Sequence, residues 1–128
     1  MRRDFVDSDL LIHKIIACAT EVHKHLGPGL LESSYERCLL QELQEAGIET
    51  ESQVSLPISY KGLDIESGYR LDIVVSGKFI IELKSVDKLQ HIHTAQLLTY
   101  LKLSGVKTGL LINFNTARLT DGIKRISL

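Results

Sequence analysis

The chain has 128 residues, of which 44% are hydrophobic and 24% are charged, and its formal net charge is −1. This length fits one domain, residues 1–128, and the composition is that of a soluble globular protein with a buried core. Strong binding of nucleic acid without sequence preference usually needs a basic surface, and the near-zero net charge argues against such a surface. No apolar run is long enough to span a membrane, and early acidic residues do not fit a secretory signal, so we expect a cytoplasmic protein.

Two helices are predicted in the first third of the chain. The first covers about residues 10–26, with Ser8 as its N-cap and Gly27 as its stop. The second covers about residues 31–46 and ends at Gly47. The two cysteines lack a C-x-x-C spacing, so we expect buried reduced thiols rather than a zinc or redox site. The residues expected to face inward are Leu11, Ile15, Cys18, Ala19, Val22 and Leu26 in the first helix, and Leu31, Tyr35, Cys38, Leu39 and Leu43 in the second.

Three strands are expected next. Residues 54–60 alternate between apolar and polar side chains, and Pro57 places this strand at an edge or interrupts its ladder. After a turn, residues 65–75 form a second strand. A short break containing a glycine then leads into residues 79–84, which is the pattern of a β-hairpin.

A third helix and a fourth strand complete the predicted core. The helix covers about residues 89–103 and ends at Gly105. The strand, residues 108–113, is apolar throughout, as in the interior of a sheet, and the helical crossover before it predicts that it runs parallel to the third strand. Residues 119–126 are expected to form a turn and a short edge strand. The stripe of the helix expected to pack into the core consists of Ile92, Ala95, Leu98 and Leu101.

The hairpin brings two acids and a lysine together. If Val75 pairs with Phe79, Asp72 lies opposite Glu82, with their Cβ atoms about 5 Å apart. Lys84 follows two residues later and therefore points to the same side. Like charges in this position need a cation, and Mg²⁺ or Mn²⁺ prefers carboxylate oxygens. The spacing predicts a metal site with a lysine beside it. The alternative is a checkerboard of salt bridges on a solvated sheet face, with Arg70 opposite Lys84.

Asp72 with Glu82-Leu83-Lys84 resembles the core signature of the PD-(D/E)xK nuclease superfamily. Upstream, Gly29-Leu30-Leu31-Glu32 resembles the glycine-then-glutamate helix motif of that superfamily. Downstream, Gln96-Leu97-Leu98-Thr99-Tyr100 is similar to the Gln-x-x-x-Tyr motif of its RecB-like branch. Together with Gly27 to Tyr35, Tyr69 to Asp72 and Leu110 to Phe114, these motifs resemble the small bacterial GxxExxR proteins of the superfamily.

The resemblance implies an α/β (α+β) fold with a restriction-endonuclease-like αβββαβ core. A central mixed four-stranded sheet would be flanked by helices, with an additional helix at the N-terminus. It also implies a metal-dependent nuclease that hydrolyses phosphodiester bonds in nucleic acid, with DNA as the expected substrate. Asp72, Glu82 and Glu32, together with the Leu83 carbonyl, would hold Mg²⁺ or Mn²⁺.

Three further residues would assist catalysis by the same resemblance. Lys84 would position the attacking water or stabilise the charge of the transition state, while Gln96 orients a water or phosphate and Tyr100 supports the lysine or the substrate. Each position also has a structural interpretation. Glu32 suits the dipole of a helix start, and Gln96 and Tyr100 fit the polar stripe of any amphipathic helix. His91 and His93 are expected to be polar residues of a helix start.

A second class of function is a nuclease-fold module that binds nucleic acid or a protein partner without cleavage. The near-neutral charge and the lack of a recognisable DNA-reading element favour it. A core of this size could need a homodimer or a protein partner to grip DNA. A third interpretation is an interaction protein whose acids form surface salt bridges.

Overall fold

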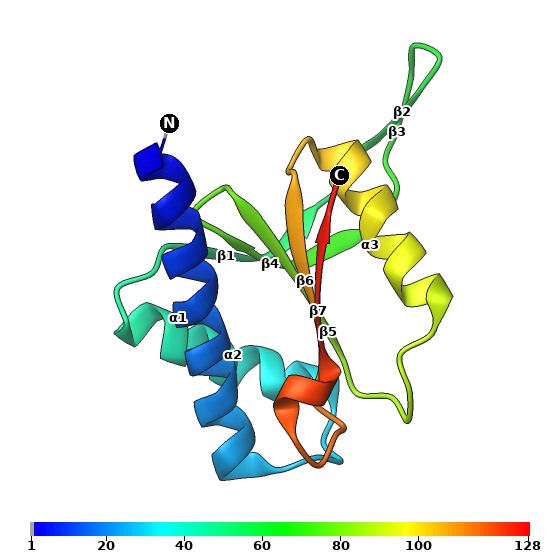
Figure 1. The fold of residues 1–128 in the computed structure, drawn as a ribbon. Coiled ribbons are helices and arrows are strands. Elements are labelled where there is room, and N and C mark those ends of the chain that lie inside the picture. The colour runs from blue at the N-terminus through cyan, green and yellow to red at the C-terminus, as the bar shows by residue number, and fades with distance from the viewer. Residues whose placement is uncertain (1) are drawn as a thin grey trace.

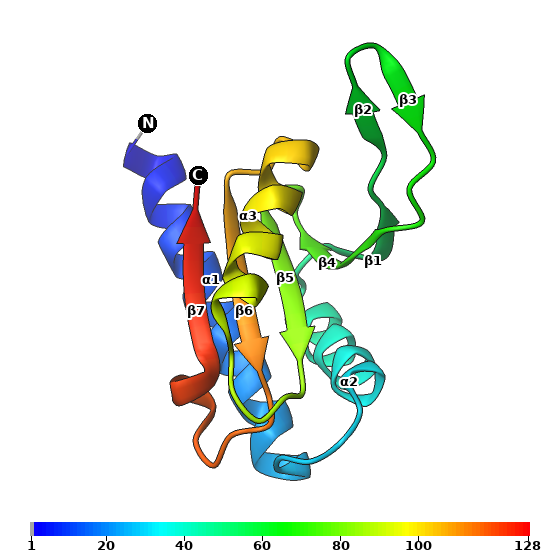
Figure 2. The same cartoon turned by 90° about the vertical axis from the view of Figure 1, so that its right-hand side faces the viewer.

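A five-stranded sheet lies between two helical layers. The computed structural model describes the backbone of residues 2–128 and the side chains of residues 8–128. Helices α1 (Arg2–Leu26) and α2 (Glu32–Glu45) cover one face of the sheet, and α3 (His91–Ser104) covers the other (Figures 1 and 2). None of the helices in this described part of the chain is long and apolar enough to cross a membrane.

The sheet has the strand order β1-β4-β5-β6-β7. Only the β5–β6 pair is parallel within this sheet, as predicted from the helical crossover between these strands. Strands β1, β4, β5 and β6 form the expected mixed core, and β7 follows the 3₁₀ turn η1 (Leu119–Gly122) to add a fifth strand at the edge. The strands span Thr50–Ser55 (β1), Arg70–Val75 (β4), Phe79–Lys84 (β5), Thr108–Asn113 (β6) and Ile123–Ser127 (β7).

The hairpin of β4 and β5 has the predicted register. Val75 pairs with Phe79, and Ile73 pairs with Ile81. Ser76 and Gly77 adopt positive φ angles of 51° and 65° in the turn, a conformation that only glycine, at Gly77, adopts without strain. The next step of this antiparallel register brings Asp72 and Glu82 side by side.

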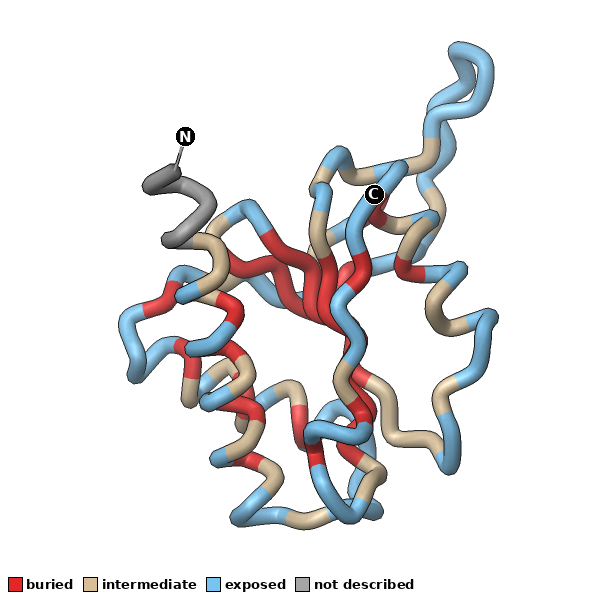
Figure 3. Tube along the Cα trace, viewed as in Figure 1, coloured by how far each residue is buried: buried red, intermediate tan, exposed pale blue. Residues whose placement is uncertain are grey.

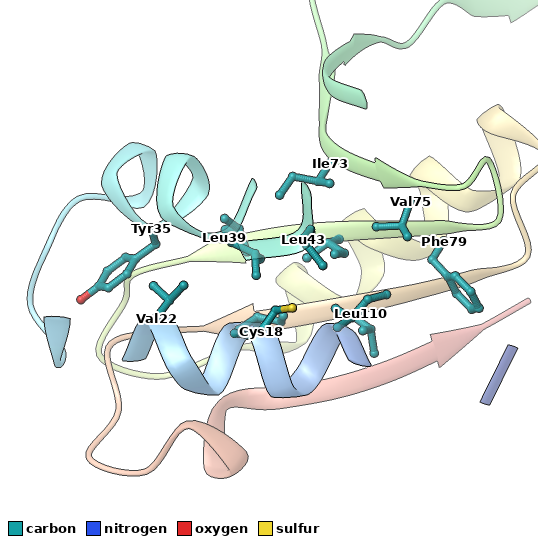
Figure 4. Packing of buried hydrophobic residues seen from close by; sticks show 14 of the residues in the cluster. Cys18, Val22, Tyr35, Leu39, Leu43, Ile73, Val75, Phe79 and Leu110 are labelled. Carbon is teal, nitrogen blue, oxygen red and sulfur yellow. The ribbon is translucent and has the colours of Figure 1, made fainter. Parts of the chain in front are cut away.

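Two hydrophobic clusters hold the layers together, one on each face of the sheet. Figure 3 shows the buried residues concentrated along the strands and the inner sides of the helices. The larger cluster joins α1 and α2 to the sheet and includes the side chains labelled in Figure 4, among them Val22, Tyr35, Leu39, Ile73 and Leu110. The smaller cluster lies under α3 and consists of Leu56, Leu71, Val74, Ile80, Leu97, Leu101, Leu111 and Ile126.

The ends of the first two helices differ partly from prediction. Helix α1 begins at Arg2, so Ser8 lies inside the helix and is not its N-cap. Leu31 precedes α2 with an extended backbone, and its side chain is 74% exposed instead of inward. The predicted stops at Gly27 and Gly47 are confirmed, since both follow the helix ends with positive φ. Cys18 is buried and Cys38 half-buried, and both are free thiols, as expected.

Residues 54–60 are not one continuous strand, and of the two predicted effects of Pro57 the interruption of the ladder is confirmed. Strand β1 ends at Ser55, because Pro57 has no N–H to continue the ladder. Strands β2 (Ile58–Tyr60) and β3 (Leu63–Ile65) instead form a separate hairpin, here called the β2–β3 arm, which projects beyond the sheet (Figures 1 and 2). The predicted strand 65–75 is therefore divided between β3 and β4.

The buried face of α3 was predicted only in part. Leu101 is buried and Leu98 packs against the cluster under α3, as predicted, but Ile92 is 67% exposed and Ala95 is exposed. Leu97, which was not in the predicted stripe, is buried. Apolar residues lie on two neighbouring stripes of this helix, so the sequence pattern alone does not show which stripe is buried. The sheet decides between them, because Gly109 in β6 leaves room for Leu97: a Cβ atom at Gly109 would lie 3.0 Å from Leu97 Cδ2.

Candidate active site

A pair of carboxyl groups lies where β4 and β5 run side by side. The Asp72 Oδ2 atom accepts a hydrogen bond of 2.9 Å from the backbone N–H of Leu83. Glu82 is only 6% exposed. Its Oε1 atom is buried and has no hydrogen-bond partner among the described residues. An unpartnered oxygen of this kind is costly, so this position calls for a proton or a cation.

The environment of Glu82 opposes a negative charge. Burial raises the pKa of its carboxyl group most strongly, and the hydrogen bond and charge of Asp72 raise it further. The positive charge of Lys84 acts in the opposite direction, but the pKa of Glu82 is still raised to about 10. Without a cation, Glu82 is therefore protonated at neutral pH and lies beside Asp72 as a neutral carboxyl group.

The salt-bridge checkerboard is wrong. Glu82 is buried instead of lying on a solvated face, and neither basic neighbour pairs with an acid. The Lys84 Nζ atom donates a hydrogen bond of 3.3 Å to Gln96 Oε1, and Arg70 Nη1 donates one of 3.3 Å to the Gln53 carbonyl. The ion pairs among the described residues lie elsewhere and join His25 to Glu21 and Arg125 to Asp9.

Helix α3 supplies one side of the site. Gln96 holds Lys84 through the hydrogen bond just described, so the polar stripe of α3 faces the end of β5. Tyr100 lies one helical turn after Gln96 and is half-buried against the cluster under α3. Burial raises its pKa most strongly, and the charges of Glu82, Tyr69 and Asp72 raise it further. His93 has the expected place at the helix start, where its Nδ1 atom accepts a hydrogen bond from the Gln90 N–H.

The segment before α2 brings Glu32 to the other side. The exposed Glu32 lies in the first turn of α2, and its Oε2 atom accepts a hydrogen bond of 3.4 Å from the Ser85 N–H just after β5. The Ser85 hydroxyl donates to the Leu30 carbonyl at 2.6 Å. The buried hydroxyl of Tyr35 donates to the Gly27 carbonyl (2.5 Å) and accepts from the Leu30 N–H (3.1 Å). These contacts tie the start of α2 to the end of β5.

Two residues near the site were missed by the sequence reasoning. Glu36 is half-buried, and burial together with the charge of Asp72 raises the pKa of its carboxyl group. Gln53 Nε2 donates a hydrogen bond of 2.8 Å to Glu36 Oε1. Glu36 lies four residues after Glu32, a spacing that puts both on one helix face and could have identified it. Nothing local marks Gln53, which is brought next to Asp72 by the pairing of β1 with β4.

The carboxyl pair fits a divalent cation with few protein ligands. Among the residues that the structure describes, no three His, Cys, Asp or Glu side chains lie close enough together to form a ligand cluster. Glu32 therefore does not join Asp72 and Glu82 as a third direct ligand in this arrangement. Mg²⁺ keeps several waters and needs only one or two carboxylates, so the unpartnered oxygen of Glu82 beside Asp72 meets its requirements.

Comparison with known families identifies one match. A family model described as the PD-(D/E)XK nuclease superfamily matches residues 9–126. No match was found among curated proteins or among solved structures. The matched range contains the start of α2, the β4–β5 hairpin that carries the carboxyl pair, and the polar stripe of α3.

Proposed function

The chain belongs to the PD-(D/E)XK nuclease superfamily, and we propose that it is a metal-dependent nuclease that hydrolyses phosphodiester bonds in nucleic acid. One observation carries this proposal: the buried carboxyl group of Glu82 lies beside Asp72 with an oxygen that no described residue satisfies. A structural role would leave that oxygen unexplained, whereas a cation shared with Asp72 satisfies it.

Asp72 and Glu82 would hold Mg²⁺ or Mn²⁺, with the Leu83 carbonyl as the further ligand that the family resemblance implies, and Glu32 would reach the ion through water. The chemistry that such an ion supplies is neutralisation of charge at the scissile phosphate and a lower pKa for a water molecule. Glu82 must lose its proton to act as a ligand, so binding competes with protonation at this site.

Lys84 would act on the phosphate by its charge. Its ammonium group is held by Gln96 at the end of β5, on the strand that carries Glu82. A positioned ammonium group stabilises negative charge that develops on the phosphate oxygens in the transition state. Gln96 would position Lys84 or a water molecule, and Tyr100 would support the substrate beside the carboxyl pair.

Several finer expectations stay predictions. DNA is the expected form of nucleic acid. A homodimer or a protein partner is expected to complete the DNA-binding surface. The cytoplasm is the expected location. The grouping with the small GxxExxR proteins also stays a prediction. Counted from Gly29 and Glu32, the position of the arginine in that motif is occupied by Tyr35.

The rival proposal is a nuclease-fold module that binds without cleavage. Two observations favour it: no third acidic or histidine side chain joins the carboxyl pair in the described part of the chain, and the formal net charge is −1. This version predicts that nucleic acid or a protein partner binds, and that divalent cations produce no cleavage.

Cleavage of labelled single-stranded and double-stranded DNA and RNA with Mg²⁺ or Mn²⁺ tests the proposal. We expect Asp72→Ala and Lys84→Ala to lose about 10²- to 10⁴-fold in rate, because each removes a group that acts on the reacting phosphate. Matched controls are Asp64→Ala in the β2–β3 arm and Lys78→Ala in the hairpin turn, both exposed and remote from the carboxyl pair. Full activity in Asp72→Ala would reject the assignment, and binding of nucleic acid without cleavage would favour the rival.

A further inference from the structure

Tyr69 is an exposed aromatic residue whose backbone is held firmly in place. Its N–H donates a hydrogen bond of 3.1 Å to the Ser67 hydroxyl, and its carbonyl accepts one of 3.0 Å from the N–H of Leu56. The Ser67 hydroxyl also donates to the carbonyl of Leu56, which is buried in the cluster under α3. Tyr69 nevertheless remains 53% exposed. The chain thus presents an aromatic ring to solvent from a fixed position.

The ring of Tyr69 lies on the side of the sheet where α3 meets the strand that carries Asp72. Tyr69 directly precedes β4, three residues before Asp72. Its ring lies 6.3 Å from that of Tyr100, at an interplanar angle of 50°. Such a tilted pair is a favourable aromatic contact, and Tyr100 lies one helical turn after Gln96, which holds Lys84 at the end of β5. Arg70, the next residue, is exposed, and its guanidinium group donates a hydrogen bond to the Gln53 carbonyl.

An unpaired nucleobase suits this surface better than a duplex does. Binding a duplex by its backbone depends on a basic surface, whereas this chain has a formal net charge of −1. Every nucleobase has a flat aromatic face that stacks on tyrosine, and that face is available only where the base is unpaired. We propose that Tyr69 stacks on a base next to the scissile phosphate, and that the substrate is therefore a single-stranded segment of nucleic acid. This inference rests on the proposed function.

The absence of tryptophan from the chain gives a direct test. Tyr69→Trp introduces the only tryptophan, and a base stacked on it should quench its fluorescence. The probe is a short fluorescein-labelled oligothymidylate with phosphorothioate links, which resist hydrolysis, used in the presence of Mn²⁺. The same strand annealed to oligodeoxyadenylate serves as the duplex probe. Tyr60→Trp, on the exposed β2–β3 arm, is the matched control.

We expect Tyr69→Ala to weaken binding of the single strand about 5- to 150-fold, the equivalent of one stacked base. Tyr69→Phe should bind like the wild type, because it keeps the ring. The single strand should quench the tryptophan at position 69 and not the one at position 60, and the duplex should bind more weakly. The inference is overturned if Tyr69→Ala binds like the wild type, if no quenching occurs at position 69, or if the wild type binds the duplex equally well or binds neither probe.

These experiments distinguish failure of the stacking inference from failure of the proposed function. If Tyr69→Ala still binds the single strand like the wild type while wild-type Mn²⁺ binding and cleavage are intact, only the stacking inference fails. If the single strand binds through Tyr69 but the protein neither binds Mn²⁺ nor cleaves, the proposed nuclease activity fails and only the stacking of Tyr69 on an unpaired base stands.

Discussion

The buried carboxyl group of Glu82 couples the stability of this protein to pH. Its pKa rises from an ordinary value of 4.5 to about 10 in the folded chain, chiefly because burial disfavours the charged form. The folded state therefore holds this proton over a pH range in which the unfolded state has lost it. In the metal-free protein, the contribution of this group to stability is complete below pH 4.5 and is lost as the pH rises towards 10.

Glu82→Gln should stabilise the metal-free protein, because glutamine keeps the shape of the protonated side chain and has no proton to lose. The expected gain at pH 7 is up to about 3 kcal/mol in the free energy of unfolding, and it should shrink towards zero near pH 4. Urea unfolding in EDTA, measured at several pH values, checks this. Equal or lower stability of the variant at pH 8 would mean that Glu82 is not a strained, protonated carboxyl group.

The hydroxyl group of Tyr35 holds the segment between α1 and α2, which leads to Glu32. Tyr35→Phe keeps the ring stacked on Phe114, whose centroid lies 4.4 Å away, but removes the hydrogen bonds to Gly27 and Leu30. We expect a loss of about 1–2 kcal/mol in the free energy of unfolding. Amide exchange at Leu30 and Glu32 should also become faster. Tyr60→Phe, at an exposed tyrosine, is the control, and an equal effect in both variants would contradict this role.

At the scale of elements, the sequence predicts best where one local pattern decides the structure. The β4–β5 hairpin is set by two β-branched runs around a glycine turn, and β6 by an apolar run bounded by polar residues. Both were therefore located correctly. The buried face of α3 depends instead on the gap that Gly109 leaves in a neighbouring strand, and no pattern within the helix records that gap.

The interruption at Pro57 and the turn after Tyr60 were predicted, but the separation of the β2–β3 arm from the main sheet was not, because residues 54–60 alternate like a single strand. Every residue of the arm except Ile58 is exposed, so the arm contributes little to either hydrophobic cluster. Replacing residues 58–65 with a Gly-Asn turn should change the free energy of unfolding by no more than about 1 kcal/mol.

Thermal unfolding of the shortened chain checks this independence. Ile126→Ala provides the contrast, because Ile126 is packed in the cluster under α3 and its truncation should cost about 2–4 kcal/mol. A shortened chain that unfolds without cooperativity would show that the arm is part of the folding unit.

At the scale of the whole molecule, the candidate site is assembled from three distant segments. Asp72, Glu82 and Lys84 belong to one hairpin, so their grouping could be predicted from strand alternation alone. Gln53 and Glu36 approach it only because β1 pairs with β4 and because α2 packs on the sheet, and Gln96 approaches it only because α3 packs on the other face. Long-range packing of this kind has no local signal. Gln96 was therefore indicated by the family resemblance and not by local spacing, and Glu36 and Gln53 were missed.

The most direct test of the account is calorimetric titration of Mn²⁺ into the wild-type protein and into Asp72→Asn, with Asp64→Asn as a matched control. Asp64 is an exposed residue of the β2–β3 arm, so its substitution changes the net charge equally without touching the site. We predict binding to the wild type and to Asp64→Asn, and none to Asp72→Asn. Equal binding to all three proteins, or none to the folded wild type, would contradict a metal centre at Asp72 and Glu82.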